Sequence, residues 1–159
     1  MRAVVQRVAS ARVLVDGAVV GEVDAGVCVL LGVAAGDDER TAERLAGKVA
    51  RLRIFENEEG RFDRSLLDTG GAALVVSQLT LIADTAKGNR PSFADAARPE
   101  RAEPLYEAFC AALEREGTAV ARGRFGTRMV VEIANDGPVT VVLEAGGAGP
   151  AEAGRPLLS

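Results

Sequence analysis

The sequence has no histidine and no tryptophan, and only two of its 159 residues are cysteines. The missing histidine excludes Ser-His-Asp and Cys-His catalysis and any histidine-ligated metal. Cys28 and Cys110 are far apart and each lies inside an apolar pattern, which indicates reduced core residues rather than a zinc site. We therefore expect no metal and no cofactor. Any catalysis would use carboxylates, hydroxyls, backbone groups or the substrate itself.

Long hydrophobic runs are also missing. No apolar stretch approaches the roughly 18 residues that a membrane-spanning helix requires. The N-terminal segment MRAVVQRVAS lacks the long apolar stretch and the small-residue cleavage site of a signal peptide. We therefore expect a cytoplasmic protein with no membrane partner. The formal net charge of −4 argues against broad, nonspecific binding of nucleic acid, but it leaves room for a local basic patch.

What the chain does contain is the composition of a globular domain, with 48% hydrophobic and 26% charged residues. Apolar runs predict strands at 3–8, 11–15, 18–23, 27–33 and 73–81. A hairpin turn is predicted at the Asp-Gly pair that separates the second and third of these strands.

Two amphipathic helices are predicted between and after these strands. The first has apolar residues at helical spacing over 42–52, with Asp37 or Asp38 as its N-cap. The second begins at Pro99 or Pro104, since either proline could occupy its first turn. Several strands before the first helix do not suit a doubly wound parallel sheet, so the sequence predicts a single α+β domain.

The segment NDGPVT (135–140) lies between two alternating apolar runs, 129–133 and 141–145. Asp-Gly between such runs is an ordinary hairpin signal. The proline directly after the glycine is unusual, because it removes a backbone donor where a returning strand would use one. In the simplest interpretation, Gly137-Pro138 merely ends the strand pairing of a hairpin.

A second unusual segment is SQLTL, where Ser77, Gln78 and Thr80 come together at the end of an apolar strand. The strand could simply emerge into solvent there. Alternatively, the strand end is a rigid mount whose backbone N–H groups stabilise an oxyanion, with Thr80 offering a hydroxyl. Without histidine, a threonine nucleophile would need a lysine or a carboxylate as its base.

Seven short motifs occur in a fixed order: VVQRV (4–8), LLGV (30–33), RIF (53–55), VVSQLTL (75–81), RPSF (90–93), GRF (123–125) and NDGPVT. In this order and at this spacing, they make the chain similar to the D-aminoacyl-tRNA deacylases, also called D-tyrosyl-tRNA(Tyr) deacylases. The resemblance runs from Met1 to about Glu144. Leu79 departs from the family pattern SQFTL, which has phenylalanine at this position. The change keeps an apolar side chain and loses an aromatic ring.

The resemblance implies a deacylase-type fold with a largely antiparallel, barrel-like core and a deacylase domain over 1–145. The Gly/Pro/Ala-rich tail, 146–159, lies outside it and is expected to be disordered. The implied activity is metal-independent hydrolysis of the ester of D-aminoacyl-tRNA, which carries the D-amino acid on its 3′-terminal adenosine. Glycine is achiral, so glycyl groups on noncognate tRNA are an expected second substrate.

The resemblance also implies a homodimer with a site shared between subunits. In this family the Gly-Pro peptide bond is cis, and the motif of one subunit enters the active site of its partner. Carried onto this chain, the motif is Gly137 and Pro138. Its carbonyl oxygens would accept hydrogen bonds from the substrate's α-ammonium, and an L side chain would clash with the motif.

The expected catalytic residues are Ser77, Gln78, Leu79 and Thr80, in the SQLTL motif. Backbone amides from Gln78 to Thr80 would hold the oxyanion, and Thr80 would position the scissile carbonyl or the water. A ribose hydroxyl of the substrate would assist proton transfer. Thr80 as a nucleophile is the alternative. Gln78 is also a candidate contact for the terminal adenosine.

The expected substrate-binding residues are Arg7, Phe93, Phe125 and Met129. Arg7 either braces the Gly-Pro segment or is a solvated surface arginine, and the other three either wall the pocket or belong to the core. Five basic residues are candidates for a phosphate-binding patch: Lys87, Arg90, Arg122, Arg124 and Arg128. Two other classes of function remain open, a noncatalytic RNA-binding module and a hydrolase of small esters or amides.

Overall fold

A six-stranded sheet organises residues 1–146, which are the residues that this computed structural model describes. Its strands are β1 (Arg2–Val15), β2 (Ala18–Val23), β3 (Gly26–Gly32), β6 (Ala72–Ser77), β7 (Ala119–Arg122) and β8 (Val130–Glu144). The sheet order is β2-β1-β3-β6-β7, and β8 pairs with the other edge of β1. The pairs that β1 makes are antiparallel, whereas β3–β6 and β6–β7 are parallel.

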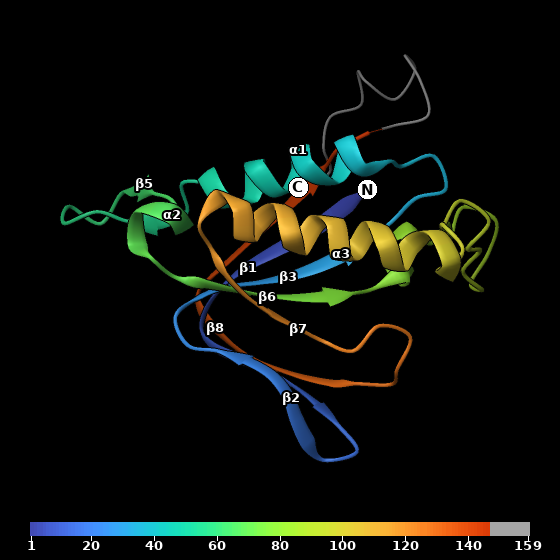
Figure 1. Ribbon diagram of the computed structural model, residues 1–159, viewed down its shortest axis with the longest axis horizontal. Coiled ribbons are helices and arrows are strands. Elements are labelled where there is room, and N and C mark those ends of the chain that lie inside the picture. Colours follow the sequence, from blue (N-terminus) through green and yellow to red (C-terminus); the bar gives the residue numbers. More distant parts are fainter. Residues whose placement is uncertain (147–159) are drawn as a thin grey trace.

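The sheet curls into a nearly closed barrel (Figure 1). β2 and β7 approach each other at Gly21, where the carbonyl oxygen of Arg122 leaves no room for a Cβ atom. Three helices accompany the sheet, α1 (Glu39–Arg51), α2 (Leu66–Thr69) and α3 (Pro99–Glu116). The predicted α+β fold with a largely antiparallel, barrel-like core is confirmed. The prediction of two helices omitted the short α2, whose single turn is too brief to show a helical period.

Both long helices begin at a local start signal, a capping side chain in α1 and a first-turn proline in α3. Asp38 caps α1, because its carboxylate accepts a hydrogen bond of 2.9 Å from the Thr41 N–H. α3 begins at Pro99. N–H groups in the first turn of a helix have no helical partner, so a proline there costs no hydrogen bond. Pro104 therefore lies inside α3 and not at its start.

Two apolar cores lie on opposite sides of the sheet. α1 and α3 run side by side over one face, as Figure 1 shows, and bury Leu45 and Phe109 against it. The second core fills the barrel and includes Val13 and Cys28. Both cysteine thiols are free and buried, as the sequence predicted.

The hairpin predicted at Asp16-Gly17 is present between β1 and β2. Both turn residues have positive φ, 49° and 79°, as a two-residue type I′ turn requires. The strands predicted at 3–8 and 11–15 are one continuous strand, because β1 stays extended through the exposed residues Ala9 and Ser10 between them.

The hairpin expected at NDGPVT is absent, and that prediction is wrong. β8 passes through this segment without reversing, and both of its halves pair with β1. Gln6 and Val8 are two residues apart on β1, but their partners on β8 are five residues apart, so the surplus residues loop out. Residues 136–139, the Gly-Pro bulge, therefore project from the middle of a strand. A local pattern could not reveal this, because it depends on the length of β1.

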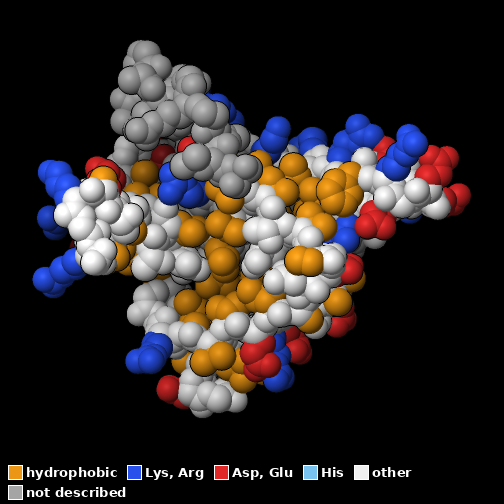
Figure 2. All heavy atoms as spheres, turned by 180° about the vertical axis from the view of Figure 1, so that it is seen from behind, with side chains coloured by type: hydrophobic (Ala, Val, Ile, Leu, Met, Phe, Trp, Pro, Cys, Tyr) orange, Lys and Arg blue, Asp and Glu red, His pale blue; other side chains and the backbone are white. Residues whose placement is uncertain are grey.

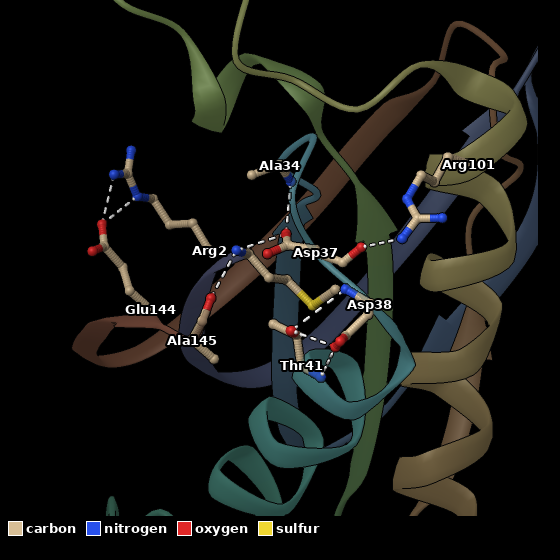
Figure 3. Close-up of polar contacts among 9 residues, drawn as sticks. Arg2, Ala34, Asp37, Asp38, Thr41, Arg101, Glu144 and Ala145 are labelled. Atoms are coloured by element: carbon tan, nitrogen blue, oxygen red, sulfur yellow. Dashed lines mark hydrogen bonds and ion pairs between the residues drawn. The ribbon is translucent and has the colours of Figure 1, made fainter. Parts of the chain in front are cut away.

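A set of buried polar contacts joins the beginning of β1, the loop before α1 and the end of β8 (Figure 3). The amino group of Met1 lies 2.7 Å from the Asp37 carboxylate and donates a 2.9 Å hydrogen bond to the Ala145 carbonyl. The Asp37 carboxylate also accepts a 2.7 Å hydrogen bond from the Ala34 N–H. These contacts fix the edge of the sheet where β3 ends.

Two further statements hold for residues 1–146. None of their helices is both long and apolar enough to cross a bilayer. They also contain no group of three or more His, Cys, Asp or Glu side chains that could hold a metal ion. The tail predicted at 146–159 lies, apart from Gly146, outside the described residues.

Candidate functional site

The SQLTL segment lies at the carboxyl edge of the parallel strands. Ser77 is the last residue of β6 and pairs with Leu31, near the end of β3. The chain then turns at Gln78 into a 3₁₀ turn, η1 (Leu79–Ile82). A strand end inside the sheet therefore carries the expected catalytic residues, and Leu79 and Thr80 are exposed there.

Two backbone amides at the start of η1 are free for a ligand. The Gln78 N–H is already used, because it donates a 2.8 Å hydrogen bond to the Leu31 carbonyl. Its expected place in an oxyanion hole is therefore wrong. Leu79 and Thr80 open the turn, so their N–H groups have no partner within it. Neither amide donates to any other group among residues 1–146.

Among the described residues, no side chain at this edge is an activated nucleophile. The Thr80 hydroxyl has no hydrogen bond to a lysine or carboxylate in residues 1–146, so a base for it is missing. Burial raises the pKa of the Cys28 and Cys110 thiols to about 12. This arrangement suits catalysis by backbone donors better than covalent catalysis.

Two residues that the sequence reasoning did not select hold η1 in place. A Cβ atom on Gly32 would lie 2.9 Å from the Leu81 Cβ, so the glycine lets η1 pack closely on the end of β3. The Arg2 guanidinium donates a 2.7 Å hydrogen bond to the Leu81 carbonyl. Glu144 holds Arg2 with contacts of 2.7 and 2.6 Å. Gly32 falls within the motif LLGV, but Arg2 has no signal in the sequence.

The predicted aromatic and methionine residues lie in the segments around this edge. The chain leaving β7 continues along β6, since the Gly123 N–H donates a 3.1 Å hydrogen bond to the Val75 carbonyl. Phe125 follows, half-buried, with its ring 6.0 Å from that of Tyr106. Met129 is also half-buried, whereas Phe93 is 42% exposed in the loop after η1.

Arg7 lies against the Gly-Pro bulge. Its side chain is 8% exposed, so the alternative of a solvated surface arginine is wrong. It donates a 3.1 Å hydrogen bond to the Asp136 carbonyl and a 2.8 Å hydrogen bond to the Ile54 carbonyl. Gly137 has a φ of 126°, which favours glycine, and its peptide bond with Pro138 is cis.

Within one chain, the structure does not bring the Gly-Pro bulge to the SQLTL segment. Arg7, beside the bulge, pairs with Val27 at the start of β3, and Ser77 pairs with Leu31 near its end. These positions differ by roughly 13 Å along the strands, and the bulge lies about three strand spacings, or roughly 14 Å, to the side. The expected residues thus form two groups at different places on the surface.

Of the five basic residues predicted to bind phosphate, one is already engaged in ion pairs. Arg122 is already paired with Glu107 at 3.0 Å and with Glu114 at 2.6 Å, so it is not free for a phosphate. The other four candidates are exposed and make no ion pair within the described part of the chain: Lys87, Arg90, Arg124 and Arg128.

An apolar strip crosses the sheet face opposite the helices. Val4 pairs with Leu30 on one side and with Val142 on the other, so the three side chains lie in a row. All three are only partly buried. Seen from behind the view of Figure 1, hydrophobic side chains form a broad band over the middle of the molecule (Figure 2). Such a band is typical of a contact surface.

Comparisons with known proteins show what this chain is similar to. A family model described as D-Tyr-tRNA(Tyr) deacylase matches residues 4–144. A D-aminoacyl-tRNA deacylase of Roseiflexus castenholzii is 59% identical over 145 residues, which is 91% of this chain and 92% of the relative. Another, from Dinoroseobacter shibae, is 57% identical over 144 residues, covering 91% and 99% of the two chains.

Two solved structures share the fold. The c-Myc DNA unwinding element binding protein superposes with a TM-score of 0.88 at 40% identity, over 92% of this chain and 100% of its own. A probable eukaryotic D-amino acid tRNA deacylase superposes with a TM-score of 0.77 over 89% and 97% of the two chains. At 20% identity, this second likeness concerns the fold alone.

Proposed function

The chain belongs to the D-Tyr-tRNA(Tyr) deacylase family, and from this premise we propose that it hydrolyses the ester of D-aminoacyl-tRNA. The products are the free D-amino acid and the tRNA. Deacylase domain 1–145 carries the whole activity, in the cytoplasm, where aminoacyl-tRNA is used.

The observation that carries the mechanism is the pair of free N–H groups of Leu79 and Thr80. Attack of water on the ester carbonyl produces a tetrahedral oxyanion, and two fixed N–H donors stabilise that charge in the transition state. The Thr80 hydroxyl positions the carbonyl or the water. A hydroxyl of the terminal ribose assists proton transfer, so the reaction needs neither histidine nor metal.

The remaining expected residues shape the pocket around this edge. Ser77 and Gln78 line it, with Gln78 against the terminal adenosine. Phe93, Phe125 and Met129 wall it. The four free basic residues described above bind phosphates of the tRNA, and this binding weakens as salt concentration rises.

Chiral selection belongs to Gly137 and Pro138. Their backbone carbonyl oxygens accept hydrogen bonds from the substrate's α-ammonium and so fix the α-carbon. A D side chain then points outward, whereas an L side chain is driven into the Gly-Pro backbone. Rejection acts on handedness alone, so one site serves many D-amino acids. Glycine passes the same filter, and glycyl groups on noncognate tRNA are therefore also removed.

The complete site requires a homodimer in which the Gly-Pro bulge of one subunit enters the SQLTL edge of the other. Three observations support this arrangement. The bulge is exposed, it lies far from the SQLTL edge of its own chain, and the strip of Val4, Leu30 and Val142 offers an apolar surface for a second copy.

Hydrolysis of D-tyrosyl-tRNA and L-tyrosyl-tRNA, measured side by side with EDTA present, tests the proposal. Rapid loss of the D-ester with the L-ester spared supports the deacylase and its chiral filter. Equal loss of both esters leaves an esterase and removes the filter. If a folded dimer supplied with metals cleaves neither ester, a noncatalytic RNA-binding module becomes the better explanation. Cleavage of D-tyrosyl esters that lack tRNA, at the same rate, would favour a small-ester hydrolase.

The proton-transfer step is tested separately. D-tyrosyl-tRNA that ends in 2′-deoxyadenosine should react much more slowly if the ribose hydroxyl takes part. An unchanged rate would remove the ribose hydroxyl from the mechanism. Near-full activity of Thr80→Ala would exclude Thr80 as the nucleophile.

A further inference from the structure

We infer that Phe62 and Glu56 are positioning residues for chiral selection, because they hold Arg7, and through it the Gly-Pro bulge, in place. Both belong to a hairpin of two short strands, β4 (Phe55–Glu56) and β5 (Phe62–Arg64). The inference rests on the proposed function, since it concerns the stereoselectivity of that site.

The Arg7 guanidinium is held from two directions. Towards the bulge, Nε donates to the Asp136 carbonyl at 3.1 Å, in the peptide group that precedes Gly137. Towards the hairpin, Nη2 lies 3.5 Å from the Glu56 carboxylate, and Cζ lies 5.8 Å from the centre of the Phe62 ring. The guanidinium therefore links the hairpin to the filter.

The bulge depends on this link because it has few other supports. Its residues interrupt the pairing between β1 and β8, and residues 135–138 are exposed. A Cβ atom on Gly137 would lie 3.1 Å from the Arg7 Nη2, so the guanidinium is packed directly against the filter backbone. Any displacement of the Arg7 side chain is passed to Gly137.

Phe62 adds to the hydrogen bonds from Arg7 to the Ile54 and Asp136 carbonyls and further restricts the guanidinium. It is 54% exposed and belongs to neither apolar core, so removing its ring takes no packing from either core. An aromatic ring face attracts a guanidinium and restricts the positions that the arginine can adopt. Glu56 contributes less, because half of its side chain is exposed and exposed ion pairs are weak. The hairpin thus acts on selectivity without touching the substrate.

The test compares kcat/KM for D-tyrosyl-tRNA and L-tyrosyl-tRNA in three variants. Phe62→Ala removes the ring, Phe62→Tyr retains a ring, and Val19→Ala removes another exposed apolar side chain, on β2. Phe62→Ala should lower the D-to-L ratio roughly two- to five-fold, the range expected for an exposed cation–π contact. Phe62→Tyr should keep the wild-type ratio, and Val19→Ala should leave it unchanged.

A double variant shows whether Phe62 acts through Arg7. In an Arg7→Gln background, Phe62→Ala should change the ratio no further, because the contact is already absent. Independent effects that add, or an unchanged ratio in Phe62→Ala itself, would overturn the inference. A wild-type protein that cleaves both esters equally would instead overturn the proposed filter, and this inference with it.

Discussion

Replacing Leu79 by proline should remove one oxyanion donor and little else. Leu79 is the first residue of η1, where the fixed φ of proline is tolerated and no helical hydrogen bond is lost. Gln78 before it is extended, with φ −143° and ψ 90°, and so lies outside the α region that proline disfavours in the residue before it. The Leu79 side chain is 53% exposed, so its loss removes little packing.

The expected cost follows from what the N–H group does in the transition state. Loss of one oxyanion-hole donor typically lowers kcat about 100- to 1,000-fold, or about 2.7–4 kcal/mol of transition-state stabilisation. KM should change far less, because the donor acts on the oxyanion and not on the bound ester. Leu79→Ala is the matched control, since it shortens the side chain but keeps the N–H, and it should retain most of the activity.

Single-turnover deacylation of D-tyrosyl-tRNA by the two variants separates the explanations. Thermal unfolding of each variant first establishes that both fold as the wild type does. Should Leu79→Pro and Leu79→Ala then hydrolyse the ester at the same rate, the Leu79 N–H stabilises no oxyanion and the mechanism is wrong.

Three further predictions concern the support of the site and the core. Gly32→Ala should displace η1 and lower kcat on the order of 100-fold in the same deacylation assay. Gly36→Ala is the control, because no atom lies within 4 Å of its new Cβ, and it should leave kcat unchanged. Cys28 and Cys110, whose thiol pKa is raised to about 12 by burial, should resist alkylation at pH 8 until the protein unfolds, as mass spectrometry would show. The hydrogen bond from the Thr41 N–H lowers the pKa of Asp38, so its contribution to stability is present above about pH 4 and is lost as pH falls further. Asp38→Asn, which still caps α1, should weaken that acid dependence in melting curves, and an identical dependence would contradict the assignment.

Much of the fold could be predicted because many turns and helix ends are determined by residues that are neighbours in the sequence. The turn at Asp16-Gly17 and the cap at Asp38 are set by a few neighbouring residues. The failure at NDGPVT has the opposite cause. Whether Asp-Gly reverses the chain or bulges from a strand depends on β1, which is far away in the sequence and pairs with both halves of β8.

The candidate site also has a part that the sequence could predict and a part that it could not. The motifs predicted Ser77 to Thr80 and Gly137-Pro138 as site residues, but could not predict which amides are free, because the Gln78 N–H is taken by Leu31 on a neighbouring strand. Arg122 looked available in the sequence and is paired with glutamates of α3 in the structure. The partners of a polar group are set by tertiary packing, which motif spacing does not encode.

Complementation between two defective subunits tests the central claim, that one chain's Gly-Pro bulge completes its partner's catalytic edge. Leu79→Pro damages the edge and leaves the bulge intact, whereas Gly137→Val damages the bulge and leaves the edge intact. Each homodimer should have lost D-selective hydrolysis. Mixed dimers, isolated with two different tags, contain one site built from the intact edge and the intact bulge. The account predicts that D-selective hydrolysis returns in them, at about half the wild-type rate per dimer if the two sites are independent. A mixed dimer no more active and no more selective than its parents would contradict it.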